Sequence, residues 1–435
     1  MTDMIKKALI SLAIIAILVP TAAWLAKPKE RVEYEDGKVV VEWFNYVTPE
    51  LLKLFEDELI PAFEKQHPKI KIHLISTLGD TGFEAKLLTL IAGDIAPDVI
   101  RVTQLNFPYF ATKDMLLDVN PLIKNDPEFD IHDYFERITD GMRYQGKLLG
   151  LPSDFSTIVL FYNKRLFDEY GVPYPDETWD YKKFLWAARK LTRDTDGDGV
   201  TDQFGFANAP RYNRWPGWVW VFGGDLFTPD VKRCTMDDPK SIEGFKFYVD
   251  LSTKYKVSPT TAESAGRDYE ELFLAERIAM IADSRYIYKR FADGVSFPWD
   301  IAPMPKGECR ATTYIWGGYS ILKSSKHPKE AWEFLKFLSD REGALLNTKA
   351  GNALPAHKQV AVSEVMHRSG VSPPHDRIFL DAIAYARQAP FPPQYAEYWQ
   401  AVGGLEDAWL GTIPVEEVCM RFTKQVNEAI SGEVW

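Results

Sequence analysis

Residues 38–76 read KVVVEWFNYVTPELLKLFEDELIPAFEKQHPKIKIHLIS, and this stretch decides the fold class. Its first part, residues 38–47, is an apolar run typical of a buried strand. Residues 48–68 carry apolar side chains at helical spacing, with Thr48 as a candidate N-cap. Residues 69–76 then alternate between apolar and polar, as a strand with one buried face does. A strand, a helix and a second strand in this order indicate a parallel α/β sheet.

The same alternation continues along the chain. Residues 93–102, GDIAPDVIRV, predict a turn that enters a third strand, and a further apolar strand is expected at 157–162. Residues 277–288 indicate another passage from strand to helix, and residues 300–307 and 314–322 are expected to pair as extended segments around a glycine turn. Because no tandem repeat or long low-complexity linker separates these parts, we expect two interleaved lobes rather than two domains in series.

The composition is that of a large globular protein. The chain has 435 residues, which suits two lobes, and 46% of them are hydrophobic. The formal net charge of -11 argues against a nucleic-acid partner, because phosphate binding needs a basic surface. Aromatic residues make up 14% of the chain, with 13 Trp and 20 Tyr; many are expected in the core, but this content also suits a pocket that stacks rings against sugars or other flat ligands. The three cysteines form no CxxC motif and predict no zinc or redox site.

The N-terminus carries the pattern of an export signal. Lys6 and Lys7 precede an uncharged apolar run, residues 8–26, and small residues that suit cleavage lie at Thr21 and Ala23. The run is also nearly long enough to span a bilayer, so an uncleaved membrane anchor is the alternative. Either way, we expect the rest of the chain at the periplasm or extracytoplasmic face.

Six segments in a fixed order carry a family resemblance. They are LIAGDIAPDVI (90–100), LPSDFSTIVLFYNKRLFDEYGV (151–172), ETWDYKKFLWAARKLT (177–192), WVWVFGGDLF (218–227), RIAMIADSRY (277–286) and YSILKSSKHPKEAWEFLKFL (319–338). Together they resemble the extracellular solute-binding proteins of ABC importers, in the sugar-binding branch that includes maltose-binding protein. The resemblance extends over about residues 38–430, nearly the whole mature chain.

The resemblance implies a two-lobed α/β periplasmic-binding-protein fold of type II, with hinge crossovers and a ligand cleft between the lobes. Lobe 1 is expected to contain residues 38–150 and about 285–330, and lobe 2 residues 151–284 and about 331–435. Residues 1–30, the signal or anchor, stay outside the fold. The resemblance also implies that the ABC permease and ATPase are separate chains. Because this sequence has no GxxxxGK[ST] phosphate-binding loop, the chain itself is not expected to hydrolyse ATP.

Polar residues that follow strands are the first candidates for ligand binding, because ligands of open α/β sheets lie outside the carboxyl ends of the strands. These candidates are Asn45, Tyr46 and Thr48 after the first strand and Thr103, Gln104 and Asn106 after the third. In the resembled family these two loops hold sugar hydroxyls; the alternative is ordinary turn and cap residues. Asp154 and Ser156 lie where the resemblance places a polar cleft residue.

Aromatic residues in loops form the second group of candidates. Tyr212 and Trp215 precede an expected helix in RYNRWPGWVW, Trp316 ends a strand, and Trp399 falls where the resemblance brings a C-terminal aromatic residue over the cleft. Pyranose rings stack on such side chains. We therefore predict that Trp215, Trp316 and Trp399 form an aromatic lining, with core packing as the alternative.

Two further features bear on the ligand. Gly317 and Gly318 follow Trp316 and would let the backbone approach a ligand closely. Arg285 occupies a position where the resembled proteins often carry tryptophan. This difference leaves room for an acidic sugar or a sugar phosphate beside a neutral oligosaccharide.

The loop DTDGDGVTD, residues 194–202, resembles part of a calcium-binding loop. Its expected oxygen ligands are Asp194, Asp196, Asp198, the Val200 carbonyl and Asp202. The position that normally supplies a bidentate acid is Gly205, so the loop is incomplete. We expect a structural Ca2+ clip and no other cofactor, and the alternative is a solvated turn without metal.

The expected function is therefore capture of a mono- or oligosaccharide for an ABC importer, without enzymatic activity. A secreted carbohydrate-active enzyme is one alternative, but it would need a pair of carboxylates across the cleft, and the motif-bearing loops offer no convincing pair. A membrane-tethered sugar sensor of the same fold is the other.

Overall fold

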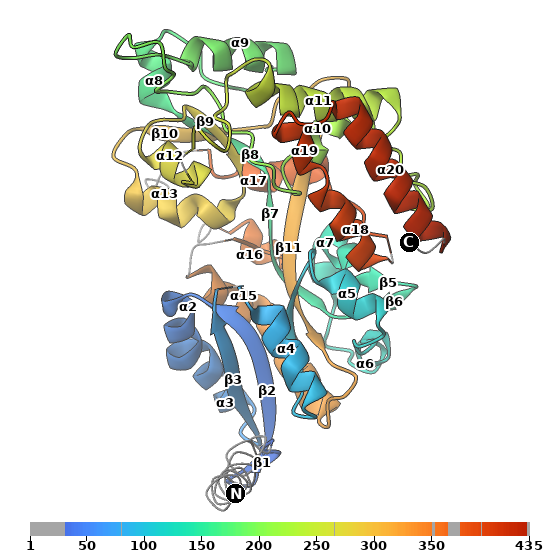
Figure 1. Ribbon diagram of the computed structural model, residues 1–435. Coiled ribbons are helices and arrows are strands. Elements are labelled where there is room, and N and C mark those ends of the chain that lie inside the picture. The colour runs from blue at the N-terminus through green and yellow to red at the C-terminus, as the bar shows by residue number, and fades with distance from the viewer. Residues whose placement is uncertain are drawn as a thin grey trace, which may run out of the picture.

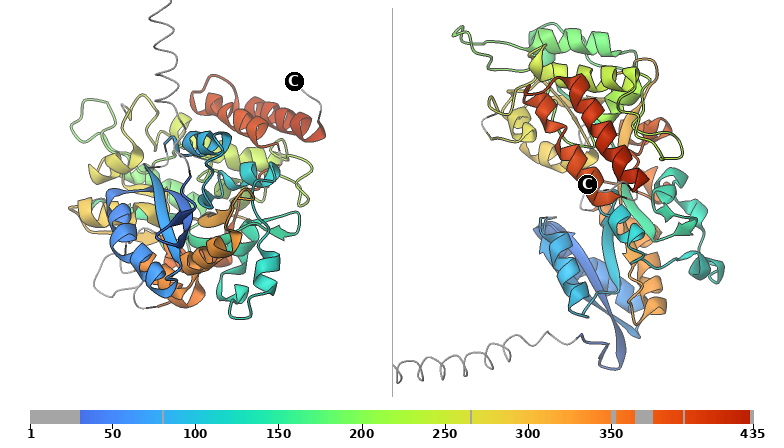
Figure 2. Two further views of the ribbon diagram at one scale, coloured as in Figure 1. Left: turned by 90° about the horizontal axis from the view of Figure 1, so that it is seen from below. Right: turned by 45° about the vertical axis from the view of Figure 1, so that its right-hand side comes forward.

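The computed structural model describes residues 31–79, 81–264, 266–349, 353–363, 375–392 and 394–432. The predicted signal or anchor at residues 1–30 lies outside the described residues. Within the described ranges, no helix combines the length and the apolar character that crossing a membrane requires. Figures 1 and 2 show two lobes stacked on one another, with the strands β7 and β11 running from one to the other.

Lobe 1 is built on a large mixed sheet. The predicted strand–helix–strand unit is present, because β2 (Lys38–Val47) pairs in parallel with both β3 (Ile70–Leu78) and β4 (Val99–Thr103). The long strand β11 (Thr312–Ile321) then pairs antiparallel with β4 on one side and with β7 (Leu151–Thr157) on the other. A strand from late in the chain thus lies in the middle of a sheet begun by the N-terminal segment.

Alternation along β2 explains how the sheet is covered on both faces. The Trp43 ring packs against Phe55 and Phe334 on one face, and the Phe44 ring stacks on Phe83 on the other. All five side chains, with Phe63, lie in one hydrophobic core. The helices that follow β2 therefore cover one face together with α14 (Pro328–Ser339), and α4 (Phe83–Ala92) covers the other.

The helix predicted over residues 48–68 is continuous but irregular. It consists of α2 (Pro49–Leu54), the π-helical turn η1 (Phe55–Leu59) and α3 (Ile60–Gln66). Pro61 has no N–H group, so the regular bond to the carbonyl four residues earlier cannot form, and the Ile60 N–H bonds back to the Phe55 carbonyl instead. The π-turn absorbs a proline inside an otherwise regular helix.

Lobe 2 has a smaller antiparallel sheet in the order β10–β8–β9. The strands are β8 (Val159–Asn163), β9 (Met280–Asp283) and β10 (Trp299–Ala302), and β9 leads into a helix as predicted. Only Ile158 separates β8 from β7, so the chain passes directly from one sheet to the other there. The segments 300–307 and 314–322 do not pair as expected, because β10 pairs with β8 whereas β11 belongs to the large sheet.

The packing places several segments differently from the predicted lobe boundaries. α14 packs on β2, β7 and β11, and β7 itself lies in the large sheet, so both belong with lobe 1. Conversely, α13 (Tyr288–Gly294) inserts Phe291 between Phe161 and Phe273 and belongs with lobe 2. The observed lobe boundaries differ from the predicted ones because the apolar face of a helix, read from the sequence, does not indicate which sheet the helix will cover.

The remaining elements complete the two lobes. In lobe 1 and its edges these are β1 (Tyr34–Glu35), α5 (Phe107–Thr112), α6 (Asn120–Lys124), η2 (Ile131–Asp133), α7 (Glu136–Gly141), β5 (Arg143–Tyr144), β6 (Lys147–Leu148), α15 (Arg341–Thr348), β12 (Leu354–Pro355) and α16 (Lys358–Ala361). Elsewhere they are α8 (Lys164–Glu169), α9 (Tyr181–Leu191), α10 (Pro216–Val221), α11 (Pro239–Thr253), α12 (Tyr269–Leu274), η3 (Arg285–Ile287), α17 (Ile378–Asp381), η4 (Ala382–Ala384), β13 (Ala386–Arg387), α18 (Tyr395–Gly403), α19 (Glu406–Trp409) and α20 (Val415–Ser431).

Candidate functional site

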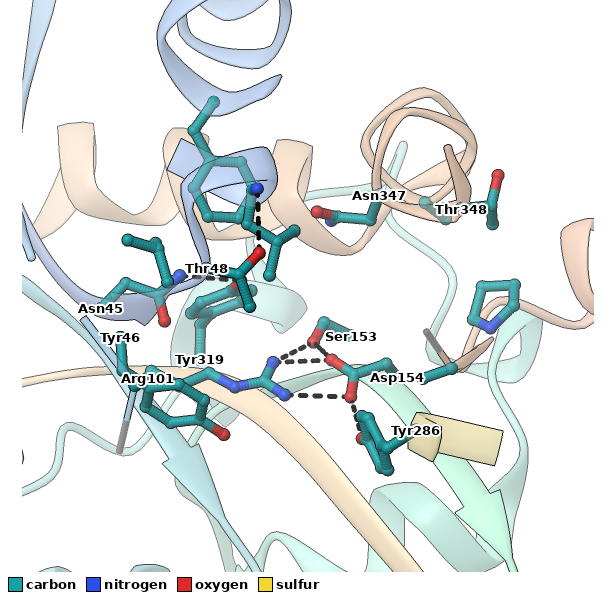
Figure 3. A pocket seen from close by; sticks show the side chains of 17 residues that line it. Asn45, Tyr46, Thr48, Arg101, Ser153, Asp154, Tyr286, Tyr319, Asn347 and Thr348 are labelled. Carbon is teal, nitrogen blue, oxygen red and sulfur yellow. Dashed lines mark hydrogen bonds and ion pairs between the residues drawn. The ribbon is translucent and has the colours of Figure 1, made fainter. Parts of the chain in front are cut away.

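A cavity of about 370 Å³ lies beside the carboxyl end of β2 (Figure 3). Its polar lining comes from the β2 end, from β4, β7 and β11, from α15, and from Tyr286 at the start of the lobe 2 segment after β9. The polar and aromatic lining residues are Asn45, Tyr46, Thr48, Phe55, Arg101, Ser153, Asp154, Tyr286, Tyr319, Asn347 and Thr348. Four of the predicted binding residues, Asn45, Tyr46, Thr48 and Asp154, are thus brought together in one cavity.

A buried ion pair forms the floor of this cavity. The two terminal nitrogens of Arg101 each donate to one carboxylate oxygen of Asp154, at 2.6 and 2.9 Å, so the pair is bidentate. Arg101 also donates to the Ser153 hydroxyl at 2.6 Å and lies over the rings of Tyr319 and Tyr46, at 5.3 and 5.9 Å from their centroids. Arg101 is only 7% exposed. The charge pair is therefore held rigidly in place before any ligand arrives.

Tyr286 connects the ion pair to lobe 2. Its hydroxyl donates to the Asp154 carboxylate, and Ser153 donates to the same group (Figure 3). Burial raises the pKa of Tyr286, so the hydroxyl keeps its proton and remains a donor. Asp154 thus joins β7 of lobe 1 to the lobe 2 segment after β9.

Asp154 stays ionised despite its burial. Removal from water alone would raise its pKa, but the charge and hydrogen bonds of Arg101, with those of Ser153 and Tyr286, outweigh this effect and lower the pKa. The floor of the cavity accordingly presents one anion and one cation of net zero charge. It offers hydrogen-bond donors and acceptors without favouring a charged ligand.

The second predicted loop is used for structure. The Asn106 side chain accepts from the Thr103 N–H at 2.8 Å, and the Gln104 side chain accepts from the Trp316 N–H at 3.0 Å. Ser156 is fully buried and accepts from the Arg285 N–H at 2.7 Å. None of these four side chains (Thr103, Gln104, Asn106 and Ser156) lines the cavity at the end of β2. The side chains of Gln104, Asn106 and Ser156 serve as partners for backbone N–H groups that the fold removes from water.

The predicted aromatic residues divide between two places. Tyr212, Trp215 and Trp399 line a second, smaller cavity of about 250 Å³ in lobe 2, where the Tyr212 hydroxyl lies 2.6 Å from that of Tyr398. Trp316 is 1% exposed, packs on Phe107 and donates its indole N–H to Gln388 at 2.9 Å. The structure therefore does not bring the three predicted tryptophans into one lining.

Gly317 and Gly318 make room for protein groups. A Cβ at Gly317 would lie 1.9 Å from a terminal nitrogen of Arg101, and one at Gly318 would lie 2.5 Å from the Leu151 carbonyl. The pairing of β11 with β7 shifts between these two glycines. The absent side chains thus admit the Arg101 guanidinium and the neighbouring strand.

Arg285 lies outside the cavity and is engaged by another carboxylate. It donates to both oxygens of Asp376, at 3.1 and 3.2 Å, and lies 4.8 Å from the centroid of the Tyr288 ring. Its side chain is 6% exposed, and that of Asp376 is 10% exposed. An acidic ligand was expected because Arg285 stands where the resembled proteins often carry tryptophan. Since Arg285 is paired with Asp376 outside the cavity, it no longer supports that expectation.

Sequence reasoning missed Arg101, Ser153, Tyr286, Tyr319, Asn347 and Thr348. Arg101 lies inside a predicted strand, not after it, and the signal that could have found it is a charged residue within an apolar strand. Ser153 and Tyr286 are immediate neighbours of the predicted residues Asp154 and Arg285. Asn347 and Thr348 end α15, more than two hundred residues from β2, and no local pattern distinguishes them.

The aspartate loop lies in lobe 2, between α9 and the segment that leads to Phe206. Oxygens of Asp194, Asp196 and Asp202 lie within 4.8 Å of one another. Asp194 accepts from the Gly197 and Gly199 N–H groups, and these bonds lower its pKa. The Asp198 carboxylate instead accepts from the Val200 N–H at 2.7 Å.

A complete calcium loop is sterically blocked. A Cβ at Gly205, the position of the missing bidentate acid, would lie 2.0 Å from the Ala188 carbonyl of α9. The chain therefore packs against the helix where an acidic side chain would have to project. The loop therefore does not provide the full seven-oxygen arrangement of a calcium-binding loop.

Comparisons with known proteins agree with this architecture. The profile of the bacterial extracellular solute-binding protein family matches residues 48–345. The maltotriose-binding protein of Pyrococcus abyssi is 22% identical over 427 residues, which cover 93% of this chain and 84% of that protein. The arabinooligosaccharide-binding protein of Halalkalibacterium halodurans is 25% identical over 305 residues, which cover 67% of this chain and 65% of that protein.

Solved structures show the same fold. An ABC substrate-binding protein from Listeria monocytogenes, in complex with cycloalternan, superimposes with a TM-score of 0.81 and 26% identity, over 91% of this chain and 99% of that one. The maltose/maltodextrin-binding domain of Bdellovibrio bacteriovorus, bound to maltotriose, gives 0.74 and 17% over 90% and 100%. The predicted two-lobed fold and family resemblance are confirmed, and the chain belongs to the bacterial extracellular solute-binding protein family.

Proposed function

We propose that this protein captures a neutral oligosaccharide in the cavity at the end of β2 and delivers it to an ABC permease and ATPase on separate chains. The observation that carries the proposal is the bidentate Arg101–Asp154 pair on the floor of that cavity. It is supported by the relatives named above, which bind maltotriose and arabinooligosaccharides.

The floor suits a sugar because each hydroxyl both donates and accepts. Asp154 would accept from a hydroxyl, while Arg101 and the Asn45 amide would donate to its neighbour. Tyr46 and Phe55 supply aromatic faces for the apolar side of the ring. Because Asp154 and Arg101 cancel in charge, a neutral sugar would bind without leaving an unbalanced buried charge.

Tyr286 gives a physical link between ligand and lobe closure. Its hydroxyl uses an oxygen of Asp154 that a sugar hydroxyl would also approach. We expect the incoming ligand to share or replace this bond, which would shift the position of the lobe 2 segment after β9. Differential contact of this kind is what allows a ligand to favour one lobe arrangement over another.

Isothermal calorimetry with neutral oligosaccharides, uronates and sugar phosphates tests the proposal. Asp154→Asn should weaken binding of the preferred neutral sugar by about 1.5–3 kcal/mol, the contribution of a hydrogen bond to a charged group. Asp237→Asn serves as the control. It changes an exposed carboxylate of lobe 2 that pairs with Arg233, and this variant should bind the sugar as the wild type does. Tighter binding of a uronate than of every neutral sugar would contradict the proposal.

The absence of enzymatic activity is part of the proposal. Of the described residues that line the cavity, Asp154 alone has a carboxyl group, and its pKa is lowered, not raised as a general acid requires. Glycoside hydrolysis generally uses two carboxyl groups of different protonation. Release of reducing ends from oligosaccharides by the purified protein would favour the enzyme instead.

Residues 8–26 are proposed to direct the chain out of the cytoplasm, either as a cleaved signal or as an anchor. N-terminal sequencing of the mature protein separates these two outcomes. A tethered sensor of the same fold would bind sugar without supporting uptake, so sugar uptake by cells that lack the protein distinguishes transport from sensing.

We also propose that Asp194, Asp196 and Asp202 hold a structural calcium ion. The support is the clustering of their oxygens within 4.8 Å. Bound calcium would raise the melting temperature, because a ligand that binds only the folded state stabilises it. An unchanged melting temperature with EDTA and with added calcium would contradict the proposal, and Asp194→Asn should remove any calcium effect.

A further inference from the structure

A groove of about 510 Å³ lies between α9 and α11 in lobe 2 and shares no residue with the cavity at the end of β2. In Figure 1 both helices lie at the top of the molecule, far from β2. The groove is lined by Tyr181, Lys182, Leu185, Trp186, Arg189, Phe222, Glu243, Lys246, Phe247, Asp250, Lys254 and Tyr255. Its size lies within the range of roughly 300–1,000 Å³ that is typical of small-molecule sites.

The groove has a continuous aromatic floor. The Tyr181 ring lies 4.6 Å from Phe222, Phe222 lies 5.2 Å from Phe247, and Phe247 lies 6.2 Å from Tyr255, measured between centroids. Trp186 stands at the rim and is 43% exposed. A large aromatic side chain left in water beside a row of rings offers a flat apolar face for a ligand.

The Asp250 side chain is buried and makes few contacts with polar groups of the protein. Asp250 is 7% exposed and lines the groove, and within the described residues its side chain accepts a single long hydrogen bond, 3.5 Å, from Thr253 on its own helix. Burial raises its pKa, while Lys246 and Lys254 act in the opposite direction without forming an ion pair with it. Because the Asp250 carboxylate lines the groove and is bonded only weakly by Thr253, it can accept a hydrogen bond from a donor outside the chain.

The surrounding charges limit the chemistry of that donor. Lys182, Arg189, Lys246 and Lys254 line the same groove, so a cationic ligand would be repelled. Lys246 is already paired with Glu416, and Glu243 and Asp250 offset two of the other three cations, so the groove carries little net charge that would attract an anionic ligand. A neutral ring with hydroxyls would stack its apolar face on the exposed Trp186 ring, donate to Asp250 and accept from the ammonium and guanidinium groups.

We propose that the groove between α9 and α11 is a second saccharide-binding site, on the outer face of lobe 2. Trp186 and Asp250 are its central contacts. The site is independent of the cavity at the end of β2, because the two share no side chain. It would hold a neutral glycan while the proposed transport site is empty or filled.

The test uses the full chain with the cavity at the end of β2 disabled by Arg101→Met combined with Asp154→Asn. This pair of changes removes both charges and leaves neither one unpaired. Maltotriose, arabinotriose and cellotriose serve as probes in calorimetry and in ligand-observed NMR. At least one probe should still bind, and Trp186→Ala should weaken that binding tenfold or more.

Tyr174→Ala is the matched control, since Tyr174 is another partly exposed aromatic residue of lobe 2, 36% exposed and outside the groove. If no probe binds the disabled chain, or if Trp186→Ala and Tyr174→Ala have equal effects, the proposal is refuted. If the disabled chain binds every probe as tightly as the wild type and Trp186→Ala removes that binding, the transport proposal is refuted instead.

Asp250→Asn separates a binding role from a structural one. A carboxylate with no strong internal partner should be replaceable, so the melting temperature should stay unchanged or rise while probe binding falls. A clear drop in melting temperature would show that Asp250 supports the fold, and it would overturn its assignment as the ligand acceptor. Binding of a peptide, but of no saccharide, would likewise overturn the proposal.

Discussion

Replacement of Arg101 by Met should destabilise the protein strongly at neutral pH. Met keeps the length and apolar body of the side chain but removes the guanidinium that pairs with Asp154 at 2.6 and 2.9 Å. Asp154 would keep two hydroxyl donors, Ser153 and Tyr286. Breaking a buried ion pair on one side generally costs about 3–5 kcal/mol. Because the two donors remain and the Asp154 side chain is 20% exposed, we expect the lower end, about 3 kcal/mol.

The pH dependence of this loss follows from the pKa of Asp154. In the wild type Arg101 lowers that pKa, so the stabilising effect is present above the unfolded value of about 3.9 and is lost as pH falls through the lower folded value. In Arg101→Met burial acts without the opposing cation, and the folded pKa should exceed the unfolded one. The destabilisation should therefore be largest near pH 7 and should shrink as the pH falls toward about 4.5.

Urea unfolding of wild type, Arg101→Met, Asp154→Asn and the double variant, at pH 7 and near pH 4.5, measures these effects. The free energy of unfolding of the double variant should exceed the additive expectation by about 2 kcal/mol, since neither charge is left alone. If Arg101→Met lowers the free energy of unfolding by less than about 1 kcal/mol, or by the same amount at both pH values, the ion pair does not stabilise the fold as argued.

Three further predictions concern packing and titration. Gly317→Ala should displace the Arg101 guanidinium, whose nitrogen would lie 1.9 Å from the new Cβ, and calorimetry should show weakened sugar binding with a stability loss of about 1–3 kcal/mol. Gly205→Ala should lower the free energy of unfolding, measured with urea, by at least as much, because the new Cβ would lie 2.0 Å from the Ala188 carbonyl oxygen, a backbone atom. The sugar affinity should stay unchanged, because this position is remote from the cavity. Burial raises the pKa of Asp340 to about 6, so wild-type stability should rise as pH falls from 7 to 5 and be lost as pH rises through that value. Asp340→Asn cannot titrate, and a melting-temperature profile that keeps the same slope over this range would contradict this attribution.

Local sequence carried the information on strands, helices and chain direction. The apolar run of β2, the helical spacing after it and the alternation of β3 are all short-range patterns, and the parallel pairing they predicted is present. Asn45 and Tyr46, near the end of β2, and Thr48 just after it lie in the cavity because a strand end is itself a local feature.

Tertiary structure decided which distant residues meet. Arg101 faces Asp154 only because β11 inserts between β4 and β7, and Gly317 of β11 leaves the space that the guanidinium fills. The same strand order determines that Trp316 is buried on Phe107, while Trp215 and Trp399 share a different cavity. Periodicity reports that a side chain will be buried, and it does not report against what.

The sequence by itself therefore determined the α/β class, the two-lobed family and one edge of the cavity. Only the tertiary structure decided the ion pair, the contact of Tyr286 from lobe 2 and the sheet to which each helix belongs. The physical reason is that hydrophobic patterning acts along a single element, whereas pairing between strands far apart in the chain depends on how all the elements pack together.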